Sequence, residues 1–250
     1  MRIRRLHCLL LLAPIVIWAQ TALAADIAHS FNWTGSYAGL HVGYGWGNGD
    51  TNFSAPDPGF GDLAPTTLSP NPDGVVGGLQ AGYNYQVGCF VFGIEADFSG
   101  SAMSGNTTSS PILDQTGTPL PNTRLTAGES INWYGTLRPR AGYAVTPSTL
   151  VYATGGLAYG NVSYSAYTDY RPILGSLYPS SFSSTKVGWA VGGGIEYAFA
   201  GCWTVVVQHL HIDLGDQSIV AAGIPQTGFQ VGYKWQTTAD IVSVGVNYKF

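Results

Sequence analysis

The most constraining feature of the sequence is a period-two alternation that recurs in eight segments of about ten residues. In the first segment, Leu40, Val42 and Tyr44 alternate with small or polar residues. Because successive side chains of a strand face opposite sides of the sheet, each segment predicts a strand with one apolar face. The predicted strands cover residues 37–46, 75–85, 90–98, 131–143, 150–160, 187–197, a segment starting at 203, and 242–250.

The composition shows what faces the apolar sides. Charged residues make up only 10% of the chain, against roughly 25% in ordinary soluble proteins, and aromatic residues 13%. The strands of a soluble β-sandwich would also alternate, but their solvent faces would carry many charged residues. Downstream of the first 24 residues, no apolar run is long enough for a spanning helix. These observations favour a transmembrane β-barrel over a sandwich.

The amino terminus has the three parts of a secretory signal peptide. Arg2, Arg4 and Arg5 precede the apolar run Leu6–Ala19, and Ala22-Leu23-Ala24 offers a small-x-small cleavage site. The run is too short for a transmembrane helix, which needs roughly 20 apolar residues. We therefore expect a signal peptide at residues 1–24 and a barrel domain at residues 25–250.

Cleavage after Ala24 would leave 7 basic and 14 acidic residues, a formal charge of −7. Lys and Arg are not clustered, which argues against a nucleic-acid partner.

The connections between the strands alternate in length. Short ones are predicted at Gln86–Cys89, Ala144–Thr149 and Ala200–Cys202, and long ones, rich in Ser, Thr, Pro, Gly and Asn, at Gly47–Asp73, Gly100–Gly128, Asn161–Ser184 and Gly215–Thr238. The sequence thus predicts an all-β fold, an eight-stranded antiparallel up-and-down transmembrane β-barrel with long extracellular loops and short periplasmic turns.

Aromatic residues should mark the two membrane borders. The expected periplasmic girdle comprises Tyr85, Phe90, Tyr143, Phe199, Trp203, Tyr248 and Phe250, and the outer girdle Trp46, Phe98, Trp133 and Tyr159.

Charged residues on the predicted inward faces form a balanced set of three acids and three bases. They are Glu95, Asp97, Glu196, Arg138, Arg140 and Lys249. An eight-stranded barrel is just wide enough for side chains to fill, and buried charges need partners. We favour a polar plug of ion pairs; a charged constriction in a narrow pore is the alternative.

Proline 139 is an anomaly in the predicted fourth strand. It cannot donate to the ladder, and a closed barrel has no free edge for it. A bulge or a local break is expected there.

Histidines could carry chemistry. His41 is expected to point into the barrel, and His209 and His211 lie two apart before Asp213. An H-x-H pair on one strand face could bind a metal or haem, and a barrel lipase could use a His with Ser and Asp. The favoured interpretation places His209 and His211 at the lipid–water border, with no catalytic residue, cofactor or metal.

Cys89 and Cys202 are the cysteines outside the signal segment. An oxidising periplasm favours a disulfide between them, but their predicted positions on opposite sides of the barrel argue against one.

Four motifs in order resemble one known family. They are Asn32–Gly39 with Val42–Gly47, Phe92–Asp97, Tyr152–Gly160 and Val244–Phe250, and they resemble the outer-membrane immunogenic proteins of alphaproteobacteria. The resemblance implies a porin-like, OmpA-type eight-stranded barrel, antigenic and inserted by the barrel assembly machinery, which reads a terminal aromatic residue. Tyr248 and Phe250 would be that assembly signal. Pro139, His209, His211 and Ser243 depart from the family pattern.

The leading expectation is a non-enzymatic, structural protein of the cell outer membrane, exported through a cleaved signal peptide. Outer-membrane lipid and lipopolysaccharide, and the assembly machinery, would be its partners. The alternatives are a narrow porin for small solutes and, behind it, haem binding or a lipid-modifying barrel enzyme.

Overall fold

A computed structural model describes residues 31–54, 66–114, 116–225, 228 and 230–250 of the chain. The expected signal peptide lies outside this range. Residues Phe31–Phe250 form one compact unit. Within the described residues, no helix is long and apolar enough to cross a bilayer.

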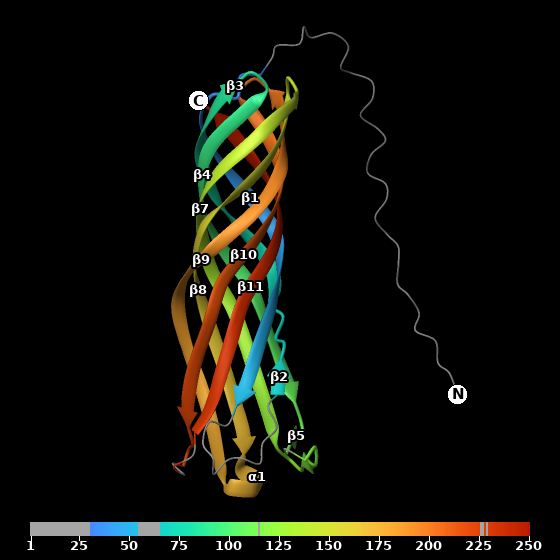
Figure 1. The fold of residues 1–250 in the computed structure, drawn as a ribbon, viewed down its shortest axis with the longest axis vertical. Coiled ribbons are helices and arrows are strands. Elements are labelled where there is room, and N and C mark those ends of the chain that lie inside the picture. Colours follow the sequence, from blue (N-terminus) through green and yellow to red (C-terminus); the bar gives the residue numbers. More distant parts are fainter. Residues whose placement is uncertain (1–30, 55–65, 115, 226–227, 229) are drawn as a thin grey trace, which may run out of the picture. The chain divides into compact units, whose positions relative to one another are not determined.

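Eight long antiparallel strands form a closed ring (Figure 1). They are β1 (Gly35–Ser54), β3 (Asp73–Val87), β4 (Phe90–Ser109), β7 (Arg124–Thr146), β8 (Thr149–Tyr170), β9 (Ser176–Ala200), β10 (Trp203–Ala222) and β11 (Gln230–Lys249). Each pairs with the next in the chain, and β1 closes the ring on β11 from Tyr37↔Lys249 to Ser54↔Gly232. The predicted fold class is confirmed.

Short elements lie between the long strands. Strand β2 (Thr66–Leu68) adds to β1, β5 (Ile112–Leu113) pairs with β6 (Pro119–Leu120), and α1 (Arg171–Leu174) joins β8 to β9.

Two-residue turns join the strands at one end of the barrel, as predicted. They are Gly88-Cys89, Pro147-Ser148 and Gly201-Cys202. Gly88 and Gly201 have φ of +61° and +54°. Only glycine adopts this left-handed conformation readily, so these turns depend on it.

The predicted long loops are wrong over most of their length. Strands β4, β8 and β9 contain 20, 22 and 25 residues, and they run through much of the segments expected to be loops. The connections that remain at this end differ in length, from the 5 residues of α1 and Gly175 between β8 and β9 to the 18 residues between β1 and β3. Residues 55–65, 115, 226–227 and 229 of the predicted loops lie outside the described range.

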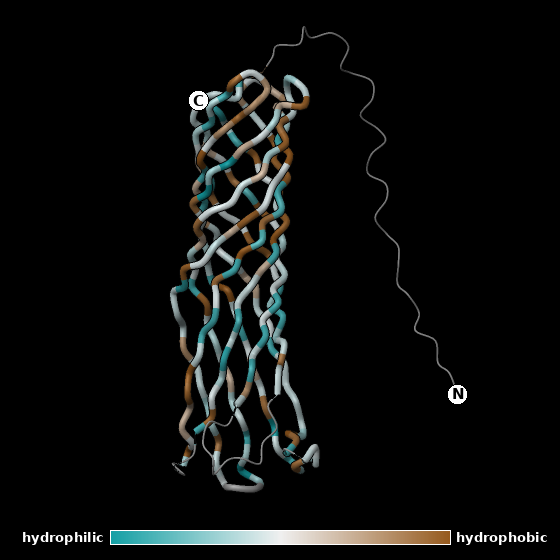
Figure 2. Tube along the Cα trace, viewed as in Figure 1, coloured by the Kyte–Doolittle hydropathy of each residue, from teal (hydrophilic) through white to brown (hydrophobic). Residues whose placement is uncertain are grey.

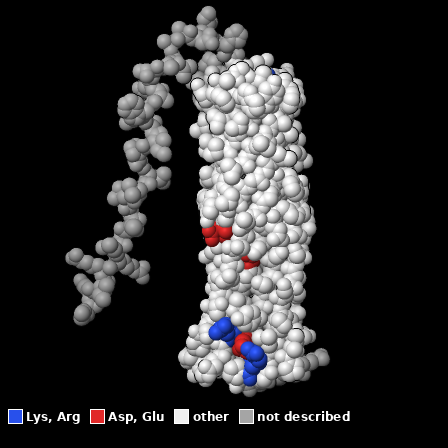
Figure 3. Space-filling view, turned by 180° about the vertical axis from the view of Figure 1, so that it is seen from behind, with Lys and Arg blue, Asp and Glu red and all other residues white. Residues whose placement is uncertain are grey.

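The predicted strands are too short because the apolar residues change sides of the barrel wall half-way along it. The outward apolar alternation that marks a membrane strand therefore ends before the strand does. In β11, Val242, Val244 and Val246 face outward near the short turns, whereas Tyr233 and Trp235, nearer the other end, are buried inside. Figure 2 shows apolar and polar residues alternating along the strands. On the face drawn in Figure 3, the half near the short turns is free of charged groups below its rim. We call the half with the apolar exterior the membrane half. The other we call the extracellular half, an orientation we propose because barrels of this class have their short turns on the periplasmic side.

The two halves are comparable in length. In β8, outward apolar residues end at Tyr159, and about ten more residues follow to Tyr170. At about 3.3 Å per residue and a tilt of about 40°, the extracellular half extends about 25 Å beyond the apolar band.

Register shifts interrupt three strands near the border between the halves. They lie at Gly100/Met103, Ile131/Trp133 and Asp213/Gly215. The predicted orientation of two residues at the shift in β7 is wrong. Ile131 is buried and Asn132 is exposed, the reverse of the expectation. A bulge adds one residue and so reverses the alternation beyond it.

Pro139 produces a local break in the ladder. It pairs with Ile94 on β4, but Pro139 has no partner in the β7–β8 ladder, which resumes at Arg140↔Thr154 in the same register as before. The expected break is therefore present without a bulge.

Candidate functional site

The lumen of the membrane half holds a layer of five charged side chains. Arg138 and Arg140 come from β7, and their register with β4 places Arg138 beside Glu95. Arg138 Nη2 lies 2.9 Å from Glu95 Oε1 and 2.8 Å from Asp97 Oδ2. Arg140 Nη1 lies 3.2 Å from Glu95 Oε2, and its Nη2 lies 2.6 Å from Glu196 Oε2. We call these five residues the charge layer.

Neutral donors supplement the charge layer. The Tyr37 hydroxyl donates to Glu95 over 2.6 Å, Thr136 donates to Asp97, and Thr204 donates to Glu196 over 2.6 Å. Asn247 adds a donor to Glu196 at 3.0 Å. Three carboxylates face two guanidinium groups, so these neutral donors stabilise the excess negative charge.

Arg140 is the centre of the layer. Its guanidinium carbon lies 4.0 Å from the centroid of the Tyr152 ring, and its Nη1 donates to the Tyr37 hydroxyl over 2.9 Å. Stacking on an aromatic face and simultaneous pairing with two carboxylates suit the planar guanidinium and would be lost in lysine.

The structure brings together five of the six interior charges that the sequence suggested. Lys249 is not among them. Its Nζ lies 5.6 Å from the Phe31 ring centroid at the rim, with no carboxylate within 4.0 Å among the described residues. The expectation that Lys249 belongs to the interior charge network is therefore wrong, because a rim cation can reach water and needs no buried partner.

Sequence reasoning missed the neutral members of the layer. Tyr37 and Asn247 stand on the predicted inward faces, so their parity was a usable signal. Thr204 carries the same signal, because it alternates with the outward residues Trp203 and Val205.

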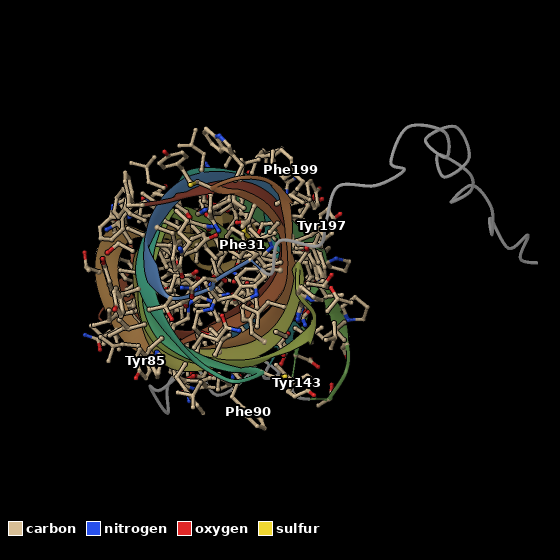
Figure 4. The ribbon with its side chains drawn as sticks, turned by 90° about the horizontal axis from the view of Figure 1, so that it is seen from above. Phe31, Tyr85, Phe90, Tyr143, Tyr197 and Phe199 are labelled. Atoms are coloured by element: carbon tan, nitrogen blue, oxygen red, sulfur yellow. The ribbon has the colours of Figure 1, made fainter. Side chains whose placement is uncertain are left out.

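Two aromatic rings close the periplasmic mouth. Trp33 is buried with Val91, Leu150 and Val206, and the Phe31 ring stands edge-on to it at 4.7 Å. Figure 4 shows Phe31 within the ring of strands, whereas Tyr85, Phe90, Tyr143, Tyr197 and Phe199 point away from it. The Trp33 amide donates to Gln86 Oε1 over 2.8 Å, which ties the segment to β3. We call Phe31 and Trp33 the aromatic cap.

An apolar core fills the extracellular half. It includes Phe53, Leu125, Val162, Tyr233 and Trp235, each at most 2% exposed. A cavity of about 10 Å³ lies among Met103, Ile131 and other largely apolar side chains. That is space for about one water molecule.

Glu129 is the exception in this core. The side chain is 2% exposed, and neither carboxylate oxygen makes a hydrogen bond of ordinary geometry with the described residues. Burial raises its pKa to about 7, an effect that nearby Thr237 only partly offsets.

The histidines occupy different environments. His41 points inward, with Nε2 2.8 Å from Ser99 Oγ. His209 Nε2 and His211 Nδ1 each lie 3.1 Å from Asp240 Oδ1 on the outer surface. The His211 ring contacts Trp189, an outward residue of the apolar band. Across the described residues, no group of three or more His, Cys, Asp or Glu side chains is arranged to hold a metal ion.

Cys89 and Cys202, the cysteines of the described residues, are free and exposed. Cys89 lies in the β3–β4 turn and Cys202 in the β9–β10 turn. Four strands separate the two turns in either direction around the ring, so they are diametrically opposed. The considered disulfide is therefore absent, since a disulfide needs Cα atoms within about 7 Å.

Aromatic side chains lie near both borders of the apolar band. On the periplasmic side, the ring centroids of Trp203 and Tyr248 are 5.0 Å apart, and those of Tyr248 and Phe250 are 5.2 Å apart. On the outer side, Trp133 contacts Phe98 and Tyr159 at 5.5 and 6.2 Å. Phe250 is 74% exposed and faces outward with Tyr248.

Comparison with known proteins agrees with this architecture. Residues 9–250 match the family model described as outer membrane protein beta-barrel domain. The chain is 34% identical over 239 residues to the 31 kDa outer-membrane immunogenic protein of Brucella melitensis, with 95% of this chain and 92% of the relative covered. It is 25% identical to the 25 kDa outer-membrane immunogenic protein of Brucella abortus, with 95% of each covered.

A solved structure shares the fold. The outer membrane protein OprG of Pseudomonas aeruginosa superposes with a TM-score of 0.52 at 13% identity, covering 90% of this chain and all of that chain.

Proposed function

The chain belongs to the outer membrane protein β-barrel family, and we propose that it is a closed, non-conducting barrel with a structural role in the outer membrane. One observation carries the proposal: three successive layers fill the lumen. The aromatic cap, the charge layer and the apolar core follow one another from the periplasmic mouth to the extracellular end. A solute would have to displace all three.

The extracellular half adds a second element to the role. Its polar exterior and apolar interior are those of a water-soluble barrel, so it needs no lipid. A rigid wall about 25 Å high would hold the outermost connections above the lipid headgroups. The Brucella relatives are named as immunogenic, and we propose that this chain too presents its outer connections as a surface antigen.

Two partners follow from the exterior. The apolar band, with its aromatic borders, would contact outer-membrane lipid, and the polar wall above it would contact lipopolysaccharide. We also propose that the barrel assembly machinery recognises the outward aromatic residues at the end of the chain, Tyr248 of β11 and Phe250, which directly follows it.

The proposal includes no catalysis. His209 and His211 share Asp240 on the lipid-facing exterior rather than in a cleft. Incubating the folded protein with phospholipid and lipopolysaccharide should therefore leave both intact. Hydrolysis that is lost in His209→Ala would instead establish the lipid-modifying enzyme.

Conductance in planar bilayers tests the closed lumen. The folded protein, its insertion verified by protease resistance in vesicles, should give no steady openings. Arg138→Ala should also stay closed, because the cap and the apolar core remain. Steady wild-type openings that Arg138→Ala abolishes would overturn the proposal in favour of a charge-lined pore.

Cysteine labelling tests the extracellular wall. In a Cys89→Ser/Cys202→Ser background, Ser163→Cys and Leu157→Cys are matched positions, six residues apart on the outward face of β8. A hydrophilic maleimide should label Ser163→Cys in vesicles and leave Leu157→Cys unmodified. Equal protection of both would mean that the membrane covers the extracellular half.

A further inference from the structure

An open groove crosses the outer face of the extracellular half. It has a volume of about 710 Å³ and is lined by residues of β7, β8, α1 and β9. Figure 3 shows two basic groups on either side of an acidic one near this end of the barrel, and Arg124, Asp169 and Arg171 are the charged residues of the groove. Neither the charge layer nor the apolar core includes any of them.

Strand register arranges the lining in cross-strand rows. Arg124, Asp169 and Leu177 form the outermost row, Thr126, Tyr167 and Pro179 the second, and Ser165 and Ser181 the third. Successive rows are two residues apart, which is about 7 Å along a strand. The groove is therefore a built surface of the barrel wall and does not depend on a flexible loop.

The cationic side of the groove is fixed by Asp169. Arg171 Nε and Nη2 donate to the two oxygens of Asp169 over 2.8 and 2.6 Å. The Arg171 side chain remains 63% exposed, whereas that of Asp169 is 17% exposed. A guanidinium has five N–H donors, so three of those on Arg171 stay free for a ligand.

Arg124 supplies the excess positive charge. Within the described residues it has no carboxylate in ion-pair range, unlike exposed Lys234, which pairs with Asp216 at 2.7 Å. Arg124 lines the groove together with Tyr167, and the side chains of Thr126 and Arg124 lower the pKa of the Tyr167 hydroxyl. Two guanidinium groups against one carboxylate give the groove a net charge of +1.

The rest of the lining is rich in hydroxyl groups. Thr126, Ser165, Tyr167 and Ser181 contribute outward hydroxyl groups, whereas the Ser180 hydroxyl is buried on the inner side of the wall. Pro179 and the Tyr167 ring, register partners, provide a small apolar platform beside them. A ligand matched to this surface has sparse negative charge, many hydroxyl groups and some apolar area.

We propose that the groove binds an acidic oligosaccharide. Arg124 and Arg171 would take carboxylate or sulfate groups through paired N–H donors, and the Ser and Thr hydroxyls would bind the sugar hydroxyls. Nucleic acid fits poorly, because one excess charge on a strongly acidic chain cannot neutralise a phosphate backbone. A lipid headgroup fits poorly too, since Tyr167 stands about 20 Å above the outermost apolar residue of its strand.

Binding of defined oligosaccharides to the full mature chain in nanodiscs tests the proposal. The probes are a sulfated heparin octasaccharide, a carboxylated galacturonic-acid octamer and neutral maltooctaose. At least one acidic probe should bind in a salt-dependent manner, and maltooctaose should not. Binding of the sulfated probe alone would indicate a host-type glycan, and binding of the carboxylated one a bacterial or plant polysaccharide.

Variants connect the binding to this groove. Arg124→Ala/Arg171→Ala should weaken acidic-probe binding by about tenfold or more, the loss expected for charge-assisted hydrogen bonds. Lys234→Ala, which removes a cation outside the groove, should stay within about twofold. The double variant Ser165→Ala/Ser181→Ala should weaken binding of the acidic oligosaccharide but leave binding of inorganic tripolyphosphate unchanged.

Three results would overturn the inference. They are failure of both acidic probes to bind, unchanged binding by the double arginine variant, and tripolyphosphate binding as tight as the oligosaccharide with no effect of the serine changes. A closed lumen would survive all three, because conductance is measured independently of this surface.

Discussion

Arg140 on β7 and Glu196 on β9 form an ion pair with 2.6 Å between Nη2 and Oε2, although β8 separates their strands in the ring. The pair therefore links wall positions that no backbone ladder joins. Both residues are at most 4% exposed, and each has further partners in the charge layer.

Removing Arg140 should be strongly destabilising. Arg140→Ala leaves Glu196 and half of Glu95 without a counter-charge inside the barrel. Breaking a buried pair from one side costs about 3–5 kcal/mol. Urea unfolding in vesicles, followed by tryptophan fluorescence, measures the change in the free energy of unfolding.

Glu196→Gln serves as the matched control. Glutamine keeps an acceptor for Thr204 and Asn247 but loses the acceptor that faces Arg140. Two guanidinium groups then face two carboxylates, so no net charge is left buried and the loss should be smaller. A cost below about 1 kcal/mol for Arg140→Ala, the value typical of exposed pairs, would show that water reaches the layer.

Glycines of β9 give a second test of how tightly the wall is built. A Cβ at Gly192 would overlap the His209 carbonyl oxygen of β10, a backbone atom that cannot rotate away. Gly192→Ala should therefore destabilise the barrel by about 1–3 kcal/mol, as overpacking does. Heat-modifiability in gel electrophoresis measures this destabilisation: the band of the folded barrel should disappear at a lower heating temperature in the variant than in the wild type.

Gly100→Ala is the appropriate comparison. The nearest atom to a Cβ there is the Gly77 carbonyl oxygen, at 3.9 Å. The two substitutions add the same methyl group to extended strand backbone. Equal stability of both variants would mean that the β9–β10 spacing relaxes freely.

The membrane half could be predicted from the sequence because lipid outside and charges inside leave opposite marks on alternate residues. Val244 and Val246 reveal the outer face of β11, and Glu95 and Asp97 the inner face of β4. Lys249 obeys the same parity yet lies at the rim, and parity carries no information on depth.

The extracellular half could not be predicted by the same rule. There, the apolar residues move inside and the outer face carries Ser, Thr and Asn, so β8 beyond Tyr159 has the composition of a loop. In β7, the apolar residues change from the outer to the inner side of the wall at the bulge at Ile131/Trp133. The extra residue keeps them at odd sequence positions on both sides of the bulge, so the sequence shows no sign of the change of side. The aromatic cap could not be predicted from alternation, because Phe31 and Trp33 precede the first strand.

The free cysteines provide a test of topology. Cys89 and Cys202 are exposed in turns on the same side of the membrane. A membrane-impermeant maleimide should modify neither in intact cells and both once the periplasm is opened, giving two adducts by mass spectrometry. Non-reducing electrophoresis should show no change on reduction. Labelling of either thiol from outside would reverse the proposed orientation.

Glu129 should make stability depend on pH through the extracellular half. Its folded pKa of about 7 lies above the ordinary value of 4.5, so the folded state binds more protons than the unfolded state between these two values. Stability is then highest below about pH 4.5, falls as pH rises toward 7 and levels off above it. The raised pKa corresponds to roughly 2–4 kcal/mol.

Glu129→Gln should remove this dependence and stabilise the protein at pH 8, because a neutral amide avoids the cost of a buried charge. Thr237→Val should instead steepen the dependence, since Thr237 partly offsets the effect of burial. Unfolding of both variants in vesicles between pH 4 and 9 measures the slopes. A wild-type slope that persists in Glu129→Gln would assign the pH dependence to other groups and leave Glu129 ionised in its apolar surroundings.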